Sequence, residues 1–432
     1  MMMKSEMLNE LFKHGETDKW NTLRKKYRRH RRAAVKKHYK KFTDVMRYRE
    51  PSKFYKIAKQ IGTGNKVQEG NLTIECIEHL PPKLQVEEVA NAFAKVSQEY
   101  EPIDLSQLPA YLPAPPPPQT NVLSVWKAIQ NLKKTKSTLP GDLPDKLRKE
   151  ASMFLAEPLT NIFNTCLNQG VYPKTWKLET VTPVPKKTKP EVLSDVRKIA
   201  STSDFSKIFE KYLKGWIMED ISNNLSKSQY GGKRGMGTEH AIVNFVDRIL
   251  KLLDSNSSTS SAIIASFIDW RGAFDRQDPT ITINQFIKLG LRSSLIPILI
   301  DYLHERKMKV KLNGEESELK DLIGGSPQGT LLGQLLYIGG SDNAAGEISE
   351  ENKFKYIDDL EVIELVSLAG ALTEYDFSQH IASDVGIQQK YLPPSTYTMQ
   401  TTLDNLAQWT EENKMKINEQ KYMYSYTIHI FL

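Results

Sequence analysis

The chain has 432 residues, 39% hydrophobic and 26% charged, so we expect it to form a sizeable core in roughly two or three domains. Its only two cysteines, Cys76 and Cys166, exclude a disulfide framework and a four-cysteine zinc site. A net charge of +7, no run of about 18 apolar residues and no signal-peptide pattern predict an intracellular protein without a membrane span.

Positive charge is concentrated early in the chain, in RKKYRRHRRAAVKKHYKK at residues 24–41. This segment contains no Pro or Gly and is rich in helix formers, so it predicts a helix within a basic, mostly helical N-terminal region, residues 1–110. Clustered Lys and Arg favour binding to nucleic-acid phosphates, with a nuclear-localisation signal or a solvated helix face as the alternatives. The candidate nucleic-acid-binding residues are Arg24, Lys25, Lys26, Arg28, Arg29, Arg31, Arg32, Lys36 and Lys37.

A proline-rich stretch, YLPAPPPPQT at residues 111–120, follows this region. Four consecutive prolines favour a stiff polyproline II segment and exclude a helix or a central strand. We therefore expect a linker here and a compact region from residue 121 to residue 432.

Helical and strand patterns alternate along this compact region. Apolar residues spaced for one helix face occur at 122–129 and again at 205–217, where Ser203 or Asp204 can cap the helix. Strand-like runs occur at residues 178–185, 261–269, 306–313 and 353–358. The pattern predicts an α+β fold in which helices pack against a mixed sheet.

Two of these strands lead into carboxylates. The apolar run that begins at Ser261 ends in Asp269, and KYIDDL places Asp358 and Asp359 side by side. Each acid alone would usually begin a loop or lie in a turn. Together they could bind divalent cations, because Mg²⁺ prefers hard oxygen ligands and often uses one or two carboxylates plus substrate phosphates. Two such ions can stabilise both the attacking and leaving oxygens of a phosphoryl transfer.

The ordered set of motifs resembles a known family. FIDWRGAFD, GGSPQGTLLG and KYIDDL resemble, in that order, the three central palm motifs of reverse transcriptases. Four segments that precede these motifs resemble LINE-like enzymes of non-LTR retrotransposons: GDLPDKLRKE, GVYPKTWKLETVTPVPKK, SDVRKIASTSDFSKIFEK and SQYGGKRGMGTEHA. WTEENKMKINEQK resembles the segment that follows the motifs. The resemblance covers roughly residues 120–425. It implies a right-hand polymerase with fingers and palm that copies an RNA template paired to a DNA primer, using dNTPs.

The resemblance also implies roles for the acids and a neighbouring aromatic residue. Asp269 and Asp358 would be the direct ligands of two Mg²⁺ ions, with Mn²⁺ as a substitute, and Asp359 a supporting third acid. Phe274 would fill the space that a ribose 2′-hydroxyl needs. Its alternative interpretation is a core aromatic residue. Asp275 is expected to support the turn instead of binding metal.

Further substrate contacts follow from the same resemblance. Gln328 and Gly329 would line the nucleotide and primer site, although residues 324–329 also fit a plain strand-to-helix turn. Arg197, Lys186 and Lys187 fall in the segment that resembles the triphosphate-binding part of the fingers, with solvated loop charges as the alternative for the lysines. Lys421 matches the position proposed to protonate the pyrophosphate leaving group.

The chain departs from the family pattern at several points. The usual Arg-Pro-Ile-Ser is Arg197-Lys198-Ile199-Ala200 here, and Gln334 replaces a common proline. No endonuclease pattern precedes the basic region and little sequence follows Lys421, so we expect a truncated thumb. A catalytically inactive nucleic-acid-binding remnant is therefore the alternative function. The basic cluster is compatible with a nuclear location.

Overall fold

The computed structural model describes residues 29, 72–108, 116–132, 142–233, 235–255, 261–367, 396–418 and 423–429. The chain divides into two units, residues 1–71 and 72–432, and the architecture below is that of the second unit. Apart from Arg29, which is helical and exposed, the basic cluster lies outside the described residues. The helical N-terminal region therefore stays a prediction.

The second unit extends toward the N-terminus beyond the proline-rich segment. The unit begins at Leu72, ahead of the proline-rich segment. Helix α4 (Pro82–Ser97) carries a stripe of apolar residues that includes Val86, Val89 and Ala90. These side chains are buried in one core with residues of the first sheet. Because this stripe needs a partner surface, residues 72–108 belong to the folded unit and the prolines lie within it.

The first sheet is mixed, and α4 packs against it. Its strands are β1 (Leu178–Pro185), β2 (Val196–Ser201), β4 (Arg306–Leu312), β5 (Glu315–Glu316) and β6 (Lys320–Leu322). Strands β1 and β2 form an antiparallel hairpin, and β1 runs parallel to β4. The short strands β5 and β6 both pair antiparallel with β4. The strands predicted at 178–185 and 306–313 are confirmed.

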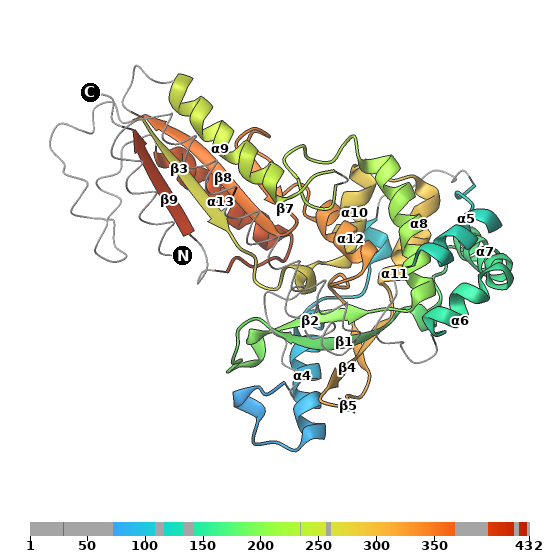
Figure 1. Cartoon of the computed structure of the whole chain (residues 1–432). Helices are drawn as coiled ribbons and strands as arrows, with labels where there is room; N and C mark the ends of the chain where they lie inside the picture. The colour runs from blue at the N-terminus through green and yellow to red at the C-terminus, as the bar shows by residue number, and fades with distance from the viewer. Residues whose placement is uncertain are drawn as a thin grey trace. The chain divides into compact units, whose positions relative to one another are not determined.

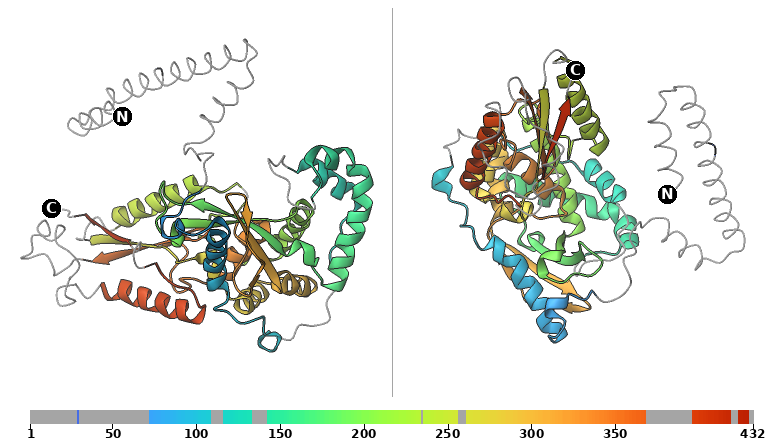
Figure 2. Two further views of the ribbon diagram at one scale, coloured as in Figure 1. Left: turned by 90° about the horizontal axis from the view of Figure 1, so that it is seen from below. Right: turned by 90° about the vertical axis from the view of Figure 1, so that its left-hand side faces the viewer.

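The second sheet is antiparallel, in the order β7-β8-β3-β9. Its strands are β3 (Ser261–Ile268), β7 (Lys353–Tyr356), β8 (Asp359–Ser367) and β9 (Met423–His429). Helices α9 (Thr238–Ser255) and α13 (Thr396–Glu412) cover its two opposite faces (Figures 1 and 2). Alternation along β3 explains this layering, because Ile263 packs in the core beside α9 and Ile264 in the core beside α13.

A core formed mainly by helices lies beside these sheets (Figure 1). Its helices are α5 (Val122–Asn131), α6 (Asp145–Glu150), α7 (Ser152–Gln169), α8 (Asp204–Ile221), α10 (Pro279–Lys288), α11 (Ile296–Leu303) and α12 (Leu331–Gly340). Short 3-10 helices also occur along the chain: η1 (Glu75–Ile77), η2 (Leu105–Gln107), η3 (Lys174–Trp176), η4 (Leu193–Asp195), η5 (Ala273–Arg276) and η6 (Ser293–Leu295). The predicted helices at 122–129 and 205–217 are confirmed, and the Ser203 hydroxyl accepts a hydrogen bond from the Phe205 N–H, as expected of a cap.

The architecture is the mixed α and β arrangement predicted from the sequence, with helices packed against a mixed sheet. None of the helices in the described ranges combines the length and apolar character needed to cross a membrane.

Candidate active site

Strand register brings the predicted acidic residues together. The pairing of β3 with β8 ends at Ile268 opposite Leu360, so continuing it by one residue places Asp269 opposite Asp359. In the adjoining hairpin Tyr356 pairs with Asp359, which leaves Ile357 and Asp358 as a two-residue turn. Directly opposed Cα atoms of antiparallel strands lie about 4.5–5.5 Å apart. The register therefore brings these acids, which are distant in the chain, to the same end of the second sheet.

The buried phenol of Tyr337 on α12 lies near these acids. Burial raises the pKa of Tyr337 well above its usual value, and the negative charges of Asp358, Asp359 and Asp269 raise it further. The charges of all three carboxylates therefore act on the same phenol. Asp269 and Asp358 are half-buried and Asp359 is exposed.

Asp269 is oriented by a residue that our sequence analysis missed. The side-chain amide of Asn418 donates to Asp269 Oδ2 at 2.7 Å, and the Asn418 backbone N–H donates to the Asp269 carbonyl at 2.8 Å. A neighbouring bridge between Trp270 and Ile417 holds the two segments together. The pattern KMKIN, read locally, carries no signal for this contact because Asn418 lies 149 residues away in the sequence.

The ligand chemistry of this site fits a divalent cation. Carboxylate oxygens are the hard ligands that Mg²⁺ prefers, and such a metal often takes one or two carboxylates plus substrate phosphates. Among the residues that the structure describes, no cluster of three or more His, Cys, Asp or Glu side chains is arranged to enclose a metal ion.

Phe274 lies beside this acidic group. Its ring stacks on Tyr337 with centroids 4.8 Å apart and an interplanar angle of 27°, and the side chain is half-buried. The Phe274 carbonyl accepts the Ser326 N–H at 2.8 Å, which joins η5 to the glycine-rich loop of residues 324–329. Phe274 therefore contacts both Tyr337 of α12 and the glycine-rich loop.

Close approach explains two glycines of this loop. A Cβ on Gly324 would come within 2.5 Å of the Tyr100 ring, and Gly325, with φ +89°, lies against the backbone of Phe274 and Asp275. Thr330 then caps α12 by accepting the Gly333 N–H at 3.0 Å. The predicted turn into an apolar helix is confirmed.

The loop also contacts the strand that carries Arg197. The Ala200 N–H donates to the Gln328 carbonyl at 2.9 Å, and a Cβ on Gly329 would come within 3.0 Å of the Ala200 oxygen. Gln328 and Gly329 are therefore brought to the end of β2, while Arg197 on the same strand is exposed.

The lysine found where the family has a proline is part of the same region. Lys198 is buried, and its Nζ lies 3.3 Å from Asp275 Oδ1. Asp275, which we expected only to support its turn, thereby links η5 to β2. No local pattern predicts this pair, because its two residues lie 77 positions apart in the chain.

The two fingers lysines contact their own hairpin. Lys186 Nζ donates to the Ser194 carbonyl at 2.8 Å, and Lys187 pairs with Asp195 at 3.0 Å and with Glu191 at 3.3 Å. The hydrogen bond to Asp195 raises the pKa of the exposed Lys187. Lys421 lies outside the described residues.

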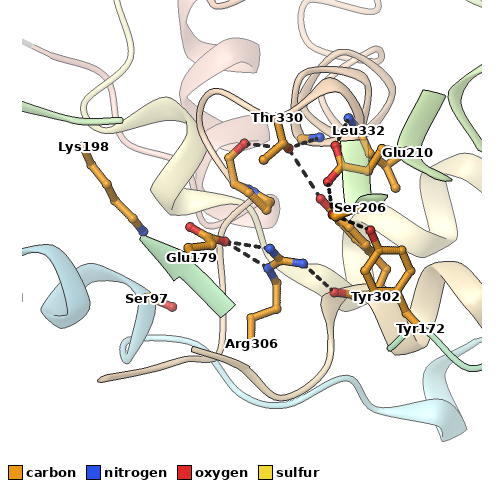
Figure 3. Close-up of polar contacts among 12 residues, drawn as sticks. Ser97, Tyr172, Glu179, Lys198, Ser206, Glu210, Tyr302, Arg306, Thr330 and Leu332 are labelled. Carbon is orange, nitrogen blue, oxygen red and sulfur yellow. Dashed lines mark hydrogen bonds and ion pairs between the residues drawn. The ribbon is translucent and has the colours of Figure 1, made fainter. Parts of the chain in front are cut away.

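A buried polar network fixes the start of α12 (Figure 3). Glu210 on α8 accepts the N–H groups of Leu331 and Leu332 at 3.0 and 3.3 Å, and Ser206 donates to its other oxygen. Burial raises the pKa of Glu210. Because α12 follows the glycine-rich loop and carries Tyr337, this carboxylate helps to set the position of both.

A second buried pair lies next to this network. Arg306 of β4 contacts Glu179 of β1 with Nε at 3.0 Å and Nη2 at 2.9 Å, and donates from Nη1 to the Tyr302 carbonyl (Figure 3). This ion pair links the parallel strands β1 and β4. Strand β1 in turn pairs with β2, which carries Lys198.

Comparison with known proteins decides the family. Residues 184–429, more than half of the chain, match the family model described as reverse transcriptase (RNA-dependent DNA polymerase). The chain belongs to the reverse transcriptase family. The matched region contains both carboxylate-bearing strands and the glycine-rich loop.

Three of the similar curated proteins come from mobile elements of Drosophila melanogaster. The RNA-directed DNA polymerase from mobile element jockey is 27% identical over 287 residues, 65% of this chain and 28% of that protein. The probable polymerase from transposon BS is 27% identical over 57% of this chain and 27% of its own length. That from transposon X-element is 30% identical over 41% of this chain and 20% of its own length. The chain spans less than a third of these relatives, and the predicted resemblance to LINE-like reverse transcriptases is confirmed.

Proposed function

We propose that this chain is an RNA-directed DNA polymerase, which transfers a deoxynucleotide from a dNTP to the 3′-hydroxyl of a primer on an RNA template. The observation that carries this proposal is the meeting of Asp269 with Asp358 and Asp359 at one end of the second sheet. Family membership supports the same chemistry.

In this reaction the acids bind metal, and two neighbouring residues orient a ligand or select the sugar. Asp269 and Asp358 hold two Mg²⁺ ions, which Mn²⁺ can replace, and Asp359 adds negative charge beside them. When bound, such ions stabilise the attacking and leaving oxygens of the transferred phosphoryl group. Phe274 excludes the 2′-hydroxyl of a ribonucleotide, and Asn418 orients the Asp269 carboxylate through its 2.7 Å hydrogen bond.

The remaining predicted residues bind substrate in this proposal. Gln328 and Gly329 line the nucleotide and primer site, and Arg197 grips the triphosphate with its planar guanidinium. Lys186 and Lys187 add positive charge from the fingers hairpin, and Lys421 protonates the pyrophosphate. The basic cluster at residues 24–41 binds the phosphates of the template–primer.

Primer extension by the purified chain tests this function. With a homopolymer RNA template, a DNA primer and Mg²⁺ or Mn²⁺, the wild type should extend the primer. Asp358→Asn should lower extension at least about 100-fold, because metal ligation supplies several kcal/mol of transition-state stabilisation. The matched control is Asp247→Asn, an exposed aspartate of α9 that pairs with Lys251.

Two outcomes would count against the proposal. Equal extension by the wild type and Asp358→Asn would remove this aspartate from the chemistry. Binding of template–primer that weakens steeply with salt, without any extension by the wild type, would instead support the catalytically inactive nucleic-acid-binding alternative.

A further inference from the structure

The turn that carries Asp358 has a strained backbone. Ile357, the first residue of the two-residue turn between β7 and β8, has φ +61°. A β-branched residue rarely adopts this left-handed conformation, which costs on the order of 1–3 kcal/mol and persists only where the surroundings enforce it. The position of Asp358 therefore depends on what holds Ile357.

The side chain of Gln229 holds both backbone groups of Ile357. Gln229 Oε1 accepts the Ile357 N–H at 3.0 Å, and Nε2 donates to the Ile357 carbonyl at 3.4 Å. The same Oε1 also accepts the Gly231 N–H at 2.8 Å. With 2% of its surface exposed, Gln229 makes these contacts inside the protein and away from water.

The segment around Gln229 runs along the open edge of β7. The Lys355 N–H donates to the Ser228 carbonyl, and the Tyr230 N–H donates to the Lys355 carbonyl, both at 2.8 Å. These bonds form a parallel bridge between Gln229 and Lys355, which fixes the position of Gln229 along β7 and beside the turn. A Cβ on Gly231 would lie 2.5 Å from the Ile357 nitrogen, so only glycine lets the segment pass this closely.

Glu350 anchors this segment from the other end. Its Oε2 accepts the Ser226 hydroxyl at 2.8 Å and the Ser228 N–H at 2.9 Å, while Lys353 pairs with Oε1 at 2.8 Å. The segment is thus tied to β7 at several points, and Gln229 cannot withdraw from Ile357 without breaking them.

We propose that Gln229 is a positioning residue for the carboxylate of Asp358. Its amide fixes the Ile357 peptide in the left-handed conformation and so directs Asp358 toward Asp269. Without the amide, Ile357 loses partners for its N–H and carbonyl, and the turn relaxes toward a conformation that isoleucine prefers. This inference rests on the proposed polymerase function, in which Asp358 is a metal ligand.

Mn²⁺ binding without substrate gives the first test. Gln229→Met keeps the length of the side chain and removes the amide, so Mn²⁺ affinity measured by electron paramagnetic resonance should fall about tenfold or more, as for other residues that orient metal ligands. Primer extension should show kcat lowered about 10–100-fold, with the KM for dNTP and the affinity for template–primer within about twofold of the wild type, because no substrate contact changes. The matched control is Gln130→Met, whose amide bonds Lys149 and Ser152 in the helical core.

Hydrogen exchange at the Ile357 amide gives a second test that needs neither metal nor activity. Exchange should be faster in Gln229→Met than in the wild type and in Gln130→Met, at equal thermal midpoints. Gln229→Glu keeps the acceptor for the two N–H groups and should restore protection. Wild-type exchange in Gln229→Met, or no rescue by Gln229→Glu, overturns the proposal. If the wild type fails to extend primers while the exchange result holds, the polymerase function fails and the positioning of the turn stands.

Discussion

Two roles were predicted for the ring of Phe274: exclusion of the ribose 2′-hydroxyl and packing in the core. It stacks on Tyr337 on one side and is half-buried, so part of its surface faces away from the core. Phe274→Ala should raise the kcat/KM for ribonucleotides relative to deoxynucleotides at least about tenfold, because a site that excludes a group by bulk loses that exclusion with the ring. Competition between rNTP and dNTP in primer extension measures this ratio.

An aromatic residue that packs in the core beside the second sheet provides the control for this prediction. Phe245 of α9 packs against Phe267 and Phe354 on the face covered by α9. Phe245→Ala should lower stability without changing sugar preference. An unchanged preference in Phe274→Ala would assign Phe274 to the core alone.

Helix α12 depends on a residue from another helix. Glu210 accepts two N–H groups at the first turn of α12 and is fully buried. Glu210→Ala should lower the free energy of unfolding by about 1–3 kcal/mol, because it leaves buried donors without an acceptor. Glu210→Gln keeps an acceptor oxygen and should cost less. Urea unfolding measures both, with Glu157→Ala, an exposed residue of α7, as the control.

Strand β7 contains a buried lysine whose pKa predicts a pH dependence. Burial lowers the pKa of Lys355 from 10.5 to about 8, against the opposing charge of Asp342, while Lys353 lowers it and Glu350 raises it. Between pH 8 and 10.5 the unfolded chain binds this proton more than the folded chain does. Stability contributed by this group is therefore lowest below pH 8 and rises with pH across that interval.

Comparison with Lys355→Met isolates this effect. The wild type should gain up to about 3 kcal/mol of unfolding free energy relative to Lys355→Met as the pH rises from 7.5 to 10.5. Lys251→Met, at an exposed position of α9, should show no such change. A constant difference between wild type and Lys355→Met over this range would show that the buried amine keeps its ordinary pKa.

Elements with a clear local pattern could be predicted from the sequence. The spacing of apolar residues in α5 and α8 indicates which helix face is buried, and both helices were predicted. Strands β1, β3, β4 and β7 were predicted from their strand-like runs. Contacts between distant segments have no local pattern. Gln229 lies 128 residues from Ile357 and Glu210 lies 121 residues from Leu331, and neither side chain differs locally from an ordinary polar residue. The motif resemblance identified the acids, and the fold was needed to show what positions them.

Residues 72–108 connect η5 to the glycine-rich loop. Ser97 bonds the backbone of Gly324, and the Tyr100 hydroxyl donates to the carbonyls of Arg276 and Lys414, each at 2.9 Å. Tyr100 is 4% exposed, and burial raises its pKa to about 12. The segment that we had assigned to a separate N-terminal region therefore supports both η5 and the glycine-rich loop.

This placement predicts how fragments of the chain behave. A fragment of residues 72–432 should unfold at the same temperature as the full chain, because it contains the whole compact unit. A fragment of residues 121–432 should fail to show a cooperative transition, since it loses α4 and with it the cover over the first sheet. Calorimetry of the three chains measures these transitions. In the full chain, Tyr100→Phe should lower the free energy of unfolding by about 1 kcal/mol, because it removes only the hydroxyl. A cooperative 121–432 fragment with a wild-type midpoint would return the domain boundary to the prolines, where the sequence pattern placed it.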